Sequence, residues 1–172
     1  MIRKALLEDL DAIMEIIGSA QALLKERGVD QWQDGYPDRD IIISDILKGE
    51  CYLLCHEGAV AATAVISTAG EVTYNQIDGA WLDSNPYIVI HRLAVGSNFL
   101  GQGRAKELFL YAEELGQNLG IKSIRVDTHK DNIAMQSLLK SLGYILCGEI
   151  TLLSGAKRVA WQLITPHEKF GF

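Results

Sequence analysis

The apolar positions at the start of the chain follow first a strand-like and then a helix-like spacing. Residues 2–5 are a short strand candidate. Over residues 8–27, apolar side chains such as Leu10 and Ile13 recur at steps of three and four, which predicts an amphipathic helix that Gly28 ends. A strand and a long helix therefore open the fold.

A second helix is expected around Pro37. Proline fits the first turn of a helix because the N–H group that it lacks has no partner there. Ile42, Ile46 and Leu47 would then form the buried side of this helix.

The middle of the chain carries three strand candidates. Residues 51–56 and 59–67 are apolar stretches joined through Glu57 and Gly58, which is a hairpin signal. A polar segment, residues 68–86, separates them from the apolar run at residues 87–95. We expect this polar segment to form a long loop or an irregular strand extension.

The alternation of strands and helices continues to the end of the chain. Helices are predicted over residues 102–119 and 132–142, and strands over residues 121–127, 144–150 and 157–164. A mixed sheet with helices on its faces, an α/β (α+β) fold, accounts for this order. The unit from residue 87 to residue 127 is expected to be a right-handed parallel crossover.

Composition and charge narrow the possibilities. The 172 residues are 48% hydrophobic, enough for one core, so a single domain over residues 1–172 is expected. The net charge is −6 and the basic residues are dispersed, which argues against a nucleic-acid partner. An acidic surface favours cationic substrates, or serves only solubility.

Membrane segments, secretion signals and metal sites are not expected. No apolar run approaches the roughly 20 residues of a membrane span, and acidic residues interrupt the start of the chain. Cys51, Cys55 and Cys147 are an odd number of cysteines without further ligands at zinc spacing. Free thiols in a reducing cytoplasm are therefore expected.

The main chemical signal is a strand that runs into a glycine-bearing turn and then a helix. Gly101 and Gly103 lie in that turn. The first N–H groups of a helix lack partners and carry partial positive charge, so a phosphate is a natural occupant. The alternative is that the two glycines only make a tight turn. The dinucleotide fingerprint and the P-loop do not fit, because no third glycine follows and no Gly-Lys-Ser/Thr end is present.

The same turn resembles the signature of the GNAT superfamily of acyl-CoA-dependent transferases, Arg/Gln-x-x-Gly-x-Gly/Ala. The two small positions match, and Leu100 departs from the first position. The departure is modest because backbone amides supply most phosphate contacts in such turns. The resemblance implies a mostly antiparallel sheet, acetyl-CoA as cosubstrate and cofactor contacts from the turn and the preceding strand end. These residues are Leu100, Gly101, Gln102, Gly103, Arg104 and Ala105, with Leu93, Ala94 and Val95.

A second stretch, residues 132–144, resembles the short helix and Gly-aromatic pair of GNAT enzymes. Asn132 is then expected near pantetheine or as the cap of the helix, and the two roles are compatible. Basic residues nearby either reach the nucleotide phosphates of CoA or are solvated: Lys140, Arg104, His129 and Lys130.

The resemblance implies that an amine attacks the thioester carbonyl directly in a ternary complex, with the oxyanion near residues 93–95. Many GNAT enzymes protonate the leaving thiolate with a tyrosine, and the corresponding position is Leu139. His91, whose ordinary pKa lies near neutrality, is the first candidate for proton transfer, and Tyr87 is the second. The alternative for His91 is a structural role within an apolar strand.

Three aromatic residues are candidates for binding the acceptor. Trp32, Tyr36 and Trp81 lie in polar stretches, off any periodic apolar face. In GNAT folds the loop between the first two helices borders the acceptor site, and aromatic faces attract cationic amines. The alternative is that the three rings cover the edge of the core. Residues 31–37 and 91–95 also resemble a poorly assigned bacterial subgroup of GNAT proteins.

Three functions are compatible with the sequence. The first is an acetyl-CoA-dependent N-acetyltransferase whose acceptor is a small amine, a peptide N-terminus or a lysine. The second is a CoA-binding regulatory or interaction module with a degenerate active site. The third is a domain that holds a different nucleotide. An exposed final strand, residues 157–164, could also pair across a homodimer.

Overall fold

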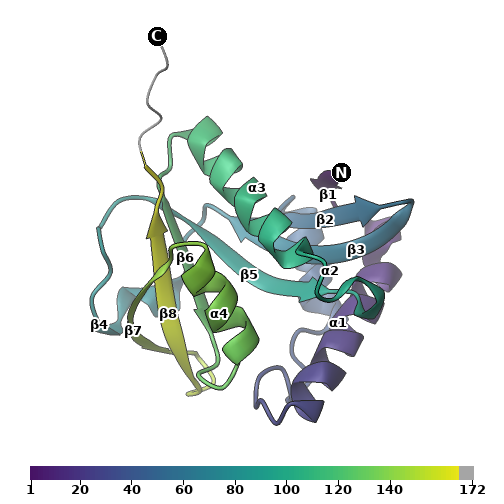
Figure 1. Ribbon diagram of the computed structural model, residues 1–172, viewed down its shortest axis with the longest axis horizontal. Coiled ribbons are helices and arrows are strands. Elements are labelled where there is room, and N and C mark those ends of the chain that lie inside the picture. The colour runs from purple at the N-terminus through teal and green to yellow at the C-terminus, as the bar shows by residue number, and fades with distance from the viewer. Residues whose placement is uncertain (167–172) are drawn as a thin grey trace.

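The computed structural model describes residues 1–166, which build one eight-stranded sheet with helices on both faces (Figure 1). The expected domain of residues 1–172 includes six residues outside this described part. The α-helices are α1 (Leu10–Glu26), α2 (Arg39–Leu47), α3 (Arg104–Leu119) and α4 (Ile133–Ser141). The short 3-10 helices are η1 (Leu7–Asp9), η2 (Val72–Asn75) and η3 (Ser97–Phe99). The strands are β1 (Ile2–Lys4), β2 (Cys51–His56), β3 (Ala59–Ser67), β4 (Ile77–Gly79), β5 (Tyr87–Val95), β6 (Ser123–Thr128), β7 (Ile145–Thr151) and β8 (Lys157–Ile164).

The strand order is β1-β2-β3-β5-β6-β8-β7-β4. The β5 and β6 strands are parallel, and the other neighbouring pairs of the described sheet are antiparallel. This confirms the mixed, mostly antiparallel α/β fold. The polar segment at residues 68–86 supplies η2 and the short edge strand β4, which the sequence pattern left open as a loop or strand extension.

The expectation of an exposed final strand is wrong. The β8 strand lies between β6 and β7 and hydrogen-bonds to both, so neither of its sides is free to pair across a dimer. The outer strands of the described sheet are β1 and β4.

Buried side chains of the described sheet belong to three hydrophobic clusters, and the two largest lie on opposite faces. In Figure 1, α3 and α4 lie in front of the sheet, and α1 and α2 lie behind it. Leu108 and Phe109 of α3 pack with Ile88 and Ile90 on the front face. On the other face, the apolar stripe of α1 packs with α2 and with Leu53 of β2.

The second helix differs from its prediction in two respects. Pro37 precedes the helix and does not occupy its first turn, since α2 begins at Arg39 and Asp38 caps it by accepting a hydrogen bond from the Ile41 N–H at 2.9 Å. Leu47 is 70% exposed, while the carboxylate-bearing Asp45 is buried. The hydrophobic pattern alone could not show that an arginine partner makes burial of Asp45 favourable.

The sheet opens on one side of β5, and this opening positions the site. The β5 strand pairs with β6 only through Tyr87, Ile88 and Val89, although both strands continue beyond that point. On its other side β5 stays paired with β3, where a bulge at Arg92 inserts one extra residue. Arg92 has a φ of 48°, a conformation that is rare for residues other than glycine. The second half of β5 therefore separates from β6, which leaves the β5 backbone on that side without a strand partner.

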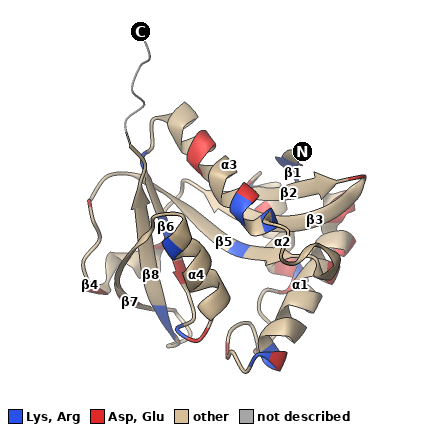
Figure 2. Cartoon of the chain, viewed as in Figure 1, with Lys and Arg blue, Asp and Glu red and all other residues tan. Residues whose placement is uncertain are grey.

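The charged side chains, the cysteines and the helices of residues 1–166 bear on the functions that are not expected from the sequence. Basic and acidic side chains are interspersed over the elements without a basic band, as Figure 2 shows. Cys51, Cys55 and Cys147 are free cysteines. Within residues 1–166, none of the helices combines the length and the hydrophobicity that crossing a bilayer requires. The same residues contain no group of three or more His, Cys, Asp or Glu side chains that could hold a metal ion.

Candidate active site

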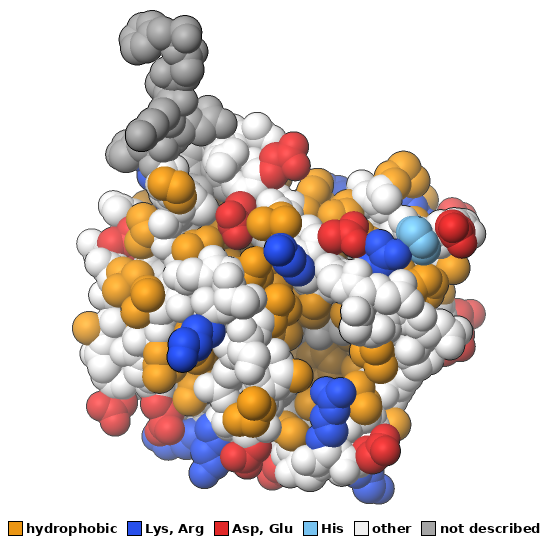
Figure 3. Space-filling model, viewed as in Figure 1, with side chains coloured by type: hydrophobic (Ala, Val, Ile, Leu, Met, Phe, Trp, Pro, Cys, Tyr) orange, Lys and Arg blue, Asp and Glu red, His pale blue; other side chains and the backbone are white. Residues whose placement is uncertain are grey.

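A cavity of about 1010 Å³ occupies the opening between β5 and β6. It is lined by the first turns of α3 and α4, by the second half of β5 and by the loop between α1 and α2. Figure 3 shows its mouth as a hollow between α4 and α1, bordered by hydrophobic side chains. Elements from both faces of the sheet thus meet around one cavity.

The glycine turn predicted to hold phosphate opens α3 at the edge of this cavity. Gly101 and Gly103 have φ values of 71° and 76°, in the left-handed region, and a Cβ atom at either position would meet nothing within 4 Å. The glycines are therefore required by backbone conformation and face open space. The bond from Glu107 N–H to the Gly103 carbonyl, at 3.1 Å, is the first along this helix, so the N–H groups of its first turn are left for a ligand. The flanking Leu100 and Ala105 line the cavity.

The backbone of β5 offers further donors. Gly96 N–H bonds to the Ala61 carbonyl in β3 at 2.8 Å, and N–H groups alternate sides along a strand. The N–H groups of Leu93 and Val95 therefore point toward β6, where β5 has no strand partner. Leu93, Ala94 and Val95 all line the cavity.

Asn132 lines the cavity and also caps α4. Its side-chain oxygen accepts a hydrogen bond from Met135 N–H at 3.1 Å, and its amide donates to Gln31 Oε1 at 3.0 Å. Gln31 belongs to the α1–α2 loop and also accepts from the Thr128 hydroxyl at 3.4 Å. The loop is therefore tied across the cavity to β6 and α4.

Arg92 fixes the bulge of β5 and the same loop. Its guanidinium binds both carboxylate oxygens of the buried Asp45 at 2.7 Å and donates to the Tyr36 hydroxyl at 2.6 Å. Trp32 has a φ of 62° and packs beside the core under α1. Trp32 and Tyr36, the expected acceptor residues of this loop, both line the cavity.

His91 and Glu71 face each other in the cavity wall. His91 Nε2 lies 3.5 Å from Glu71 Oε2. Burial lowers the pKa of His91 to about 4, aided by the charge of Arg92 and opposed by Glu71. The imidazole is therefore neutral at neutral pH. The other Glu71 oxygen accepts hydrogen bonds from the N–H and hydroxyl of Thr73, which hold the carboxylate toward His91.

The depressed pKa of His91 predicts a pH-dependent stability. In the unfolded chain a histidine has a pKa near 6.5, so as pH falls the unfolded state binds the proton first and folding becomes less favourable. Between pH 7.5 and pH 5 this group is expected to cost the folded state about 2 kcal/mol. Urea unfolding of wild type and His91→Gln at both pH values measures it. The variant should lose about 2 kcal/mol less than wild type, and equal losses would contradict the assignment.

Asp127 forms the far wall of the cavity. Its carboxylate accepts a hydrogen bond from the buried Tyr74 hydroxyl at 2.6 Å. Burial raises the pKa of Asp127, and the bond from Tyr74 partly offsets this effect. The bond also anchors η2, and with it Glu71, to β6.

Seven of the expected site residues are not part of the cavity wall: Gly101, Gln102 and Gly103, which lie at its edge between Leu100 and Ala105, and Trp81, Tyr87, Lys140 and Arg104. Trp81 donates from its indole nitrogen to the Tyr74 carbonyl at 2.8 Å and stacks on Arg125, with 4.4 Å from the guanidinium carbon to the ring centre. Tyr87 stacks on the other side of Arg125, at 4.0 Å, and its hydroxyl accepts from Glu71 N–H at 3.2 Å. Lys140 is exposed on α4, and Arg104 pairs with Glu107 at 2.8 Å.

The pattern of the sequence did not reveal Glu71, Gln31 or Asp127 as site residues. Gln31 stands next to the aromatic Trp32, which was the available signal. Glu71 and Asp127 carried none, because the contacts through Tyr74 and Tyr87 that bring Glu71 to His91 join segments far apart in the chain.

Comparison with known proteins agrees with this geometry. Residues 15–144 match the family model described as the acetyltransferase (GNAT) family. A GNAT-family acetyltransferase of known structure from Streptococcus agalactiae is 38% identical, with a TM-score of 0.86 over 96% of this chain and 95% of that one. An uncharacterized N-acetyltransferase of Bacillus subtilis, YesJ, is 29% identical over 149 residues, 84% of this chain and 81% of that protein.

A more distant structure shares the fold. The PaiA N-acetyltransferase of Thermoplasma acidophilum, solved in complex with coenzyme A, is 14% identical with a TM-score of 0.69. The superposition covers 95% of this chain and 98% of that one.

Proposed function

Because the chain belongs to the GNAT acetyltransferase family, we propose that it transfers the acetyl group of acetyl-CoA to an amine by direct attack in a ternary complex. The observation that carries this proposal is the juxtaposition in one cavity of the α3 glycine turn, the unpaired backbone of β5 and the His91–Glu71 pair. The glycine turn and the β5 backbone suit a CoA thioester, and the His91–Glu71 pair suits a reaction that releases a proton.

Acetyl-CoA is proposed to lie along β5 with its pyrophosphate on the α3 turn. The first N–H groups of α3, near Gly101 and Gly103, would bind the phosphate oxygens. The N–H groups of Leu93 and Val95 would pair with pantetheine and the thioester, as a strand would. Asn132 lies at the opposite wall.

The chemistry then requires few groups from the protein. The amine nitrogen attacks the thioester carbon, the carbonyl oxygen takes the negative charge, and a backbone N–H near residues 93–95 stabilises it. Collapse of this intermediate breaks the C–S bond and releases the CoA thiolate. Leu139, where many relatives carry a tyrosine, is fully buried at 0% exposure, so the thiolate is expected to leave without protonation from this position.

His91 and Glu71 are proposed to accept the proton of the attacking amine. Since Nε2 of His91 faces a carboxylate oxygen, it carries the imidazole hydrogen, which leaves Nδ1 as the acceptor. Glu71 then stabilises the imidazolium that forms. Tyr87 is the second candidate from the sequence. Its hydroxyl accepts a hydrogen bond from the backbone N–H of Glu71, so we propose it as a positioning residue.

The acceptor is proposed to enter beside Trp32 and Tyr36, on the side of the α1–α2 loop. Trp81 has no part in this proposal because it packs on Arg125 outside the cavity. The reaction is placed in the cytoplasm, where acetyl-CoA is available.

The test is release of CoA thiol from acetyl-CoA by the purified protein, over a panel of amines, peptides and lysine-containing peptides. Acetyl-CoA binding is measured in parallel by calorimetry. Binding with amine-dependent thiol release supports the proposal. Binding without release on any amine would instead support the alternative of a CoA-binding module, and failure of acetyl-CoA to bind would exclude both.

A further inference from the structure

Arg158 is a half-buried cation that forms no ion pair among residues 1–166. Its Nη1 donates to the Lys157 carbonyl at 2.9 Å, the one hydrogen bond of its side chain within that part of the chain. The other arginine that forms no ion pair there, Arg27, is exposed. Five arginines are paired, as Arg3–Asp9, Arg39–Asp11, Arg92–Asp45, Arg104–Glu107 and Arg125–Asp83.

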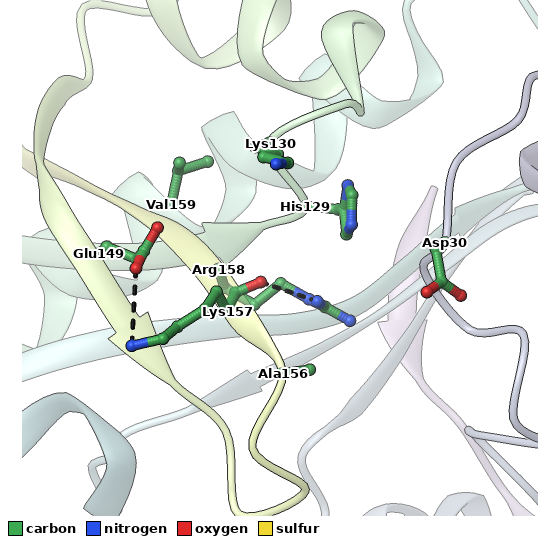
Figure 4. A pocket seen from close by; sticks show the side chains of 8 residues that line it. All are labelled: Asp30, His129, Lys130, Glu149, Ala156, Lys157, Arg158 and Val159. Atoms are coloured by element: carbon green, nitrogen blue, oxygen red, sulfur yellow. Dashed lines mark hydrogen bonds and ion pairs between the residues drawn. The ribbon is translucent and has the colours of Figure 1, made fainter.

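Arg158 stands between the main cavity and a smaller hollow of about 280 Å³, and it lines both. Figure 4 shows its guanidinium extending from β8 into the space between His129 and Asp30. On the cavity side, the charge of Arg158 lowers the pKa of Asp127, an effect that works against burial. Arg158 and Asp127 both belong to the wall of the main cavity.

The other charges of the hollow do not neutralise Arg158. Lys157 bonds to Thr151 at 2.9 Å and pairs with Glu149 at 3.6 Å, so that carboxylate is occupied. Asp30 faces the guanidinium across the hollow without forming an ion pair. The Nδ1 atom of His129 accepts a hydrogen bond from Asp131 N–H at 3.0 Å.

Three cations, Lys130, Lys157 and Arg158, thus stand against two carboxylates, Asp30 and Glu149, which leaves a net charge of +1 (3 − 2) in the hollow. The chain as a whole has a net charge of −6. An excess of positive charge at this place therefore runs against the average of the molecule and suits an anionic group.

On the basis of the proposed function, we infer that the acceptor is a small amine that also carries a carboxylate, with its amine at His91 and Glu71 and its carboxylate on Arg158. His91, Glu71 and Arg158 all line the main cavity, so one small molecule could contact both the His91–Glu71 pair and the guanidinium. A planar guanidinium binds a carboxylate through two parallel hydrogen bonds, which fixes the orientation of the amine.

Amines in matched pairs test this inference: free amino acids, including ω-amino acids of increasing length, against their carboxamides. With wild type, kcat/KM is expected to be at least tenfold higher for the carboxylate of a productive pair. Arg158→Gln should remove this preference by lowering kcat/KM for the carboxylate at least tenfold, with little change for the amide. Arg158→Lys should retain part of the preference, because the charge remains and the two-bond geometry is lost.

Two controls separate this role from a structural one. Arg39→Gln removes an exposed arginine charge elsewhere and should keep the wild-type preference. Acetyl-CoA affinity and the urea midpoint of Arg158→Gln should match wild type. Peptides with an aspartate or asparagine after the N-terminal residue distinguish a peptide carboxylate from a free amino acid.

Each result decides the inference. Acetylation of the uncharged members alone, or an equal loss for both members of a pair in Arg158→Gln, overturns it and leaves the proposed function standing. Acetylation of no member overturns the inference, and the wider panel of amines and peptides then decides the proposed function separately. A carboxylate preference that depends on Arg158 supports it.

Discussion

Replacing Gly103 with glutamate is expected to weaken acetyl-CoA binding at least about 100-fold, a loss of about 2.7 kcal/mol. Gly103 adopts a left-handed conformation directly before the first helical residue of α3, and the space beside it is open. A carboxylate there would occupy the proposed pyrophosphate position and repel it. Two like charges about 4 Å apart near a protein surface repel by about 4 kcal/mol, enough for the expected effect. Calorimetric titration with acetyl-CoA measures it.

The same helix supplies a matched control at its other end. Gly120 caps the C-terminus of α3 with a φ of 71°, and a Cβ atom there also meets nothing within 4 Å. Gly120→Glu therefore adds the same charge and the same backbone strain, far from the cavity. We expect this variant to bind acetyl-CoA as wild type does. Equal affinity of the two variants would mean that the pyrophosphate does not bind at the α3 turn.

Glu71→Gln is expected to lower kcat by roughly 100-fold, within the range for loss of a general acid or base, and to leave acetyl-CoA binding unchanged. Glutamine keeps the oxygen that accepts from Thr73, so the loop should hold its shape. It removes the negative charge beside His91 Nε2 and with it the stabilisation of the imidazolium. Steady-state rates at saturating acetyl-CoA with a productive amine give the change.

Glu114→Gln, on the exposed side of α3, makes the same chemical change away from the cavity and should keep the wild-type kcat. Thr73→Val removes one of the two hydrogen bonds that Thr73 donates to Glu71 and should give a smaller loss than Glu71→Gln. A wild-type kcat in Glu71→Gln would show that the proton leaves by another route.

Local motifs made much of the fold predictable, including the two helix starts beside the cavity. The glycine turn and the cap at Asn132 depend on neighbours in sequence, and the structure has Gly103 and Asn132 at the helix starts where they were expected. The apolar spacing of α1 likewise identified its buried face. In these elements a few adjacent residues determine the backbone conformation.

The part of the cavity where the acceptor is proposed to bind was less predictable, because it is formed by contacts between segments that are far apart in the sequence. The sequence pattern places Arg92 in an apolar strand and in the stretch 91–95 that resembles a GNAT subgroup. It does not show that Arg92 pairs with Asp45, which is buried on α2 while Leu47 is exposed. Trp81 lies in a polar stretch of the sequence. In the structure its ring stacks on Arg125 of β6, outside the cavity. Such pairings depend on which strands and helices become neighbours in the fold, and the spacing of hydrophobic residues does not predict them.

The unpaired side of β5 links the binding of a ligand to the stability of the folded protein. Beyond Val89 this strand has a neighbour on one side alone, so a bound pantetheine chain would serve as the missing strand. A ligand that binds only the folded protein stabilises it by RT ln(1 + [L]/Kd), about 2.7 kcal/mol at a hundredfold excess over Kd. With acetyl-CoA bound as proposed, the resistance of the protein to heat and proteases is expected to rise and fall with the acetyl-CoA supply. A cell depleted of acetyl-CoA is then expected to hold a less stable, shorter-lived protein.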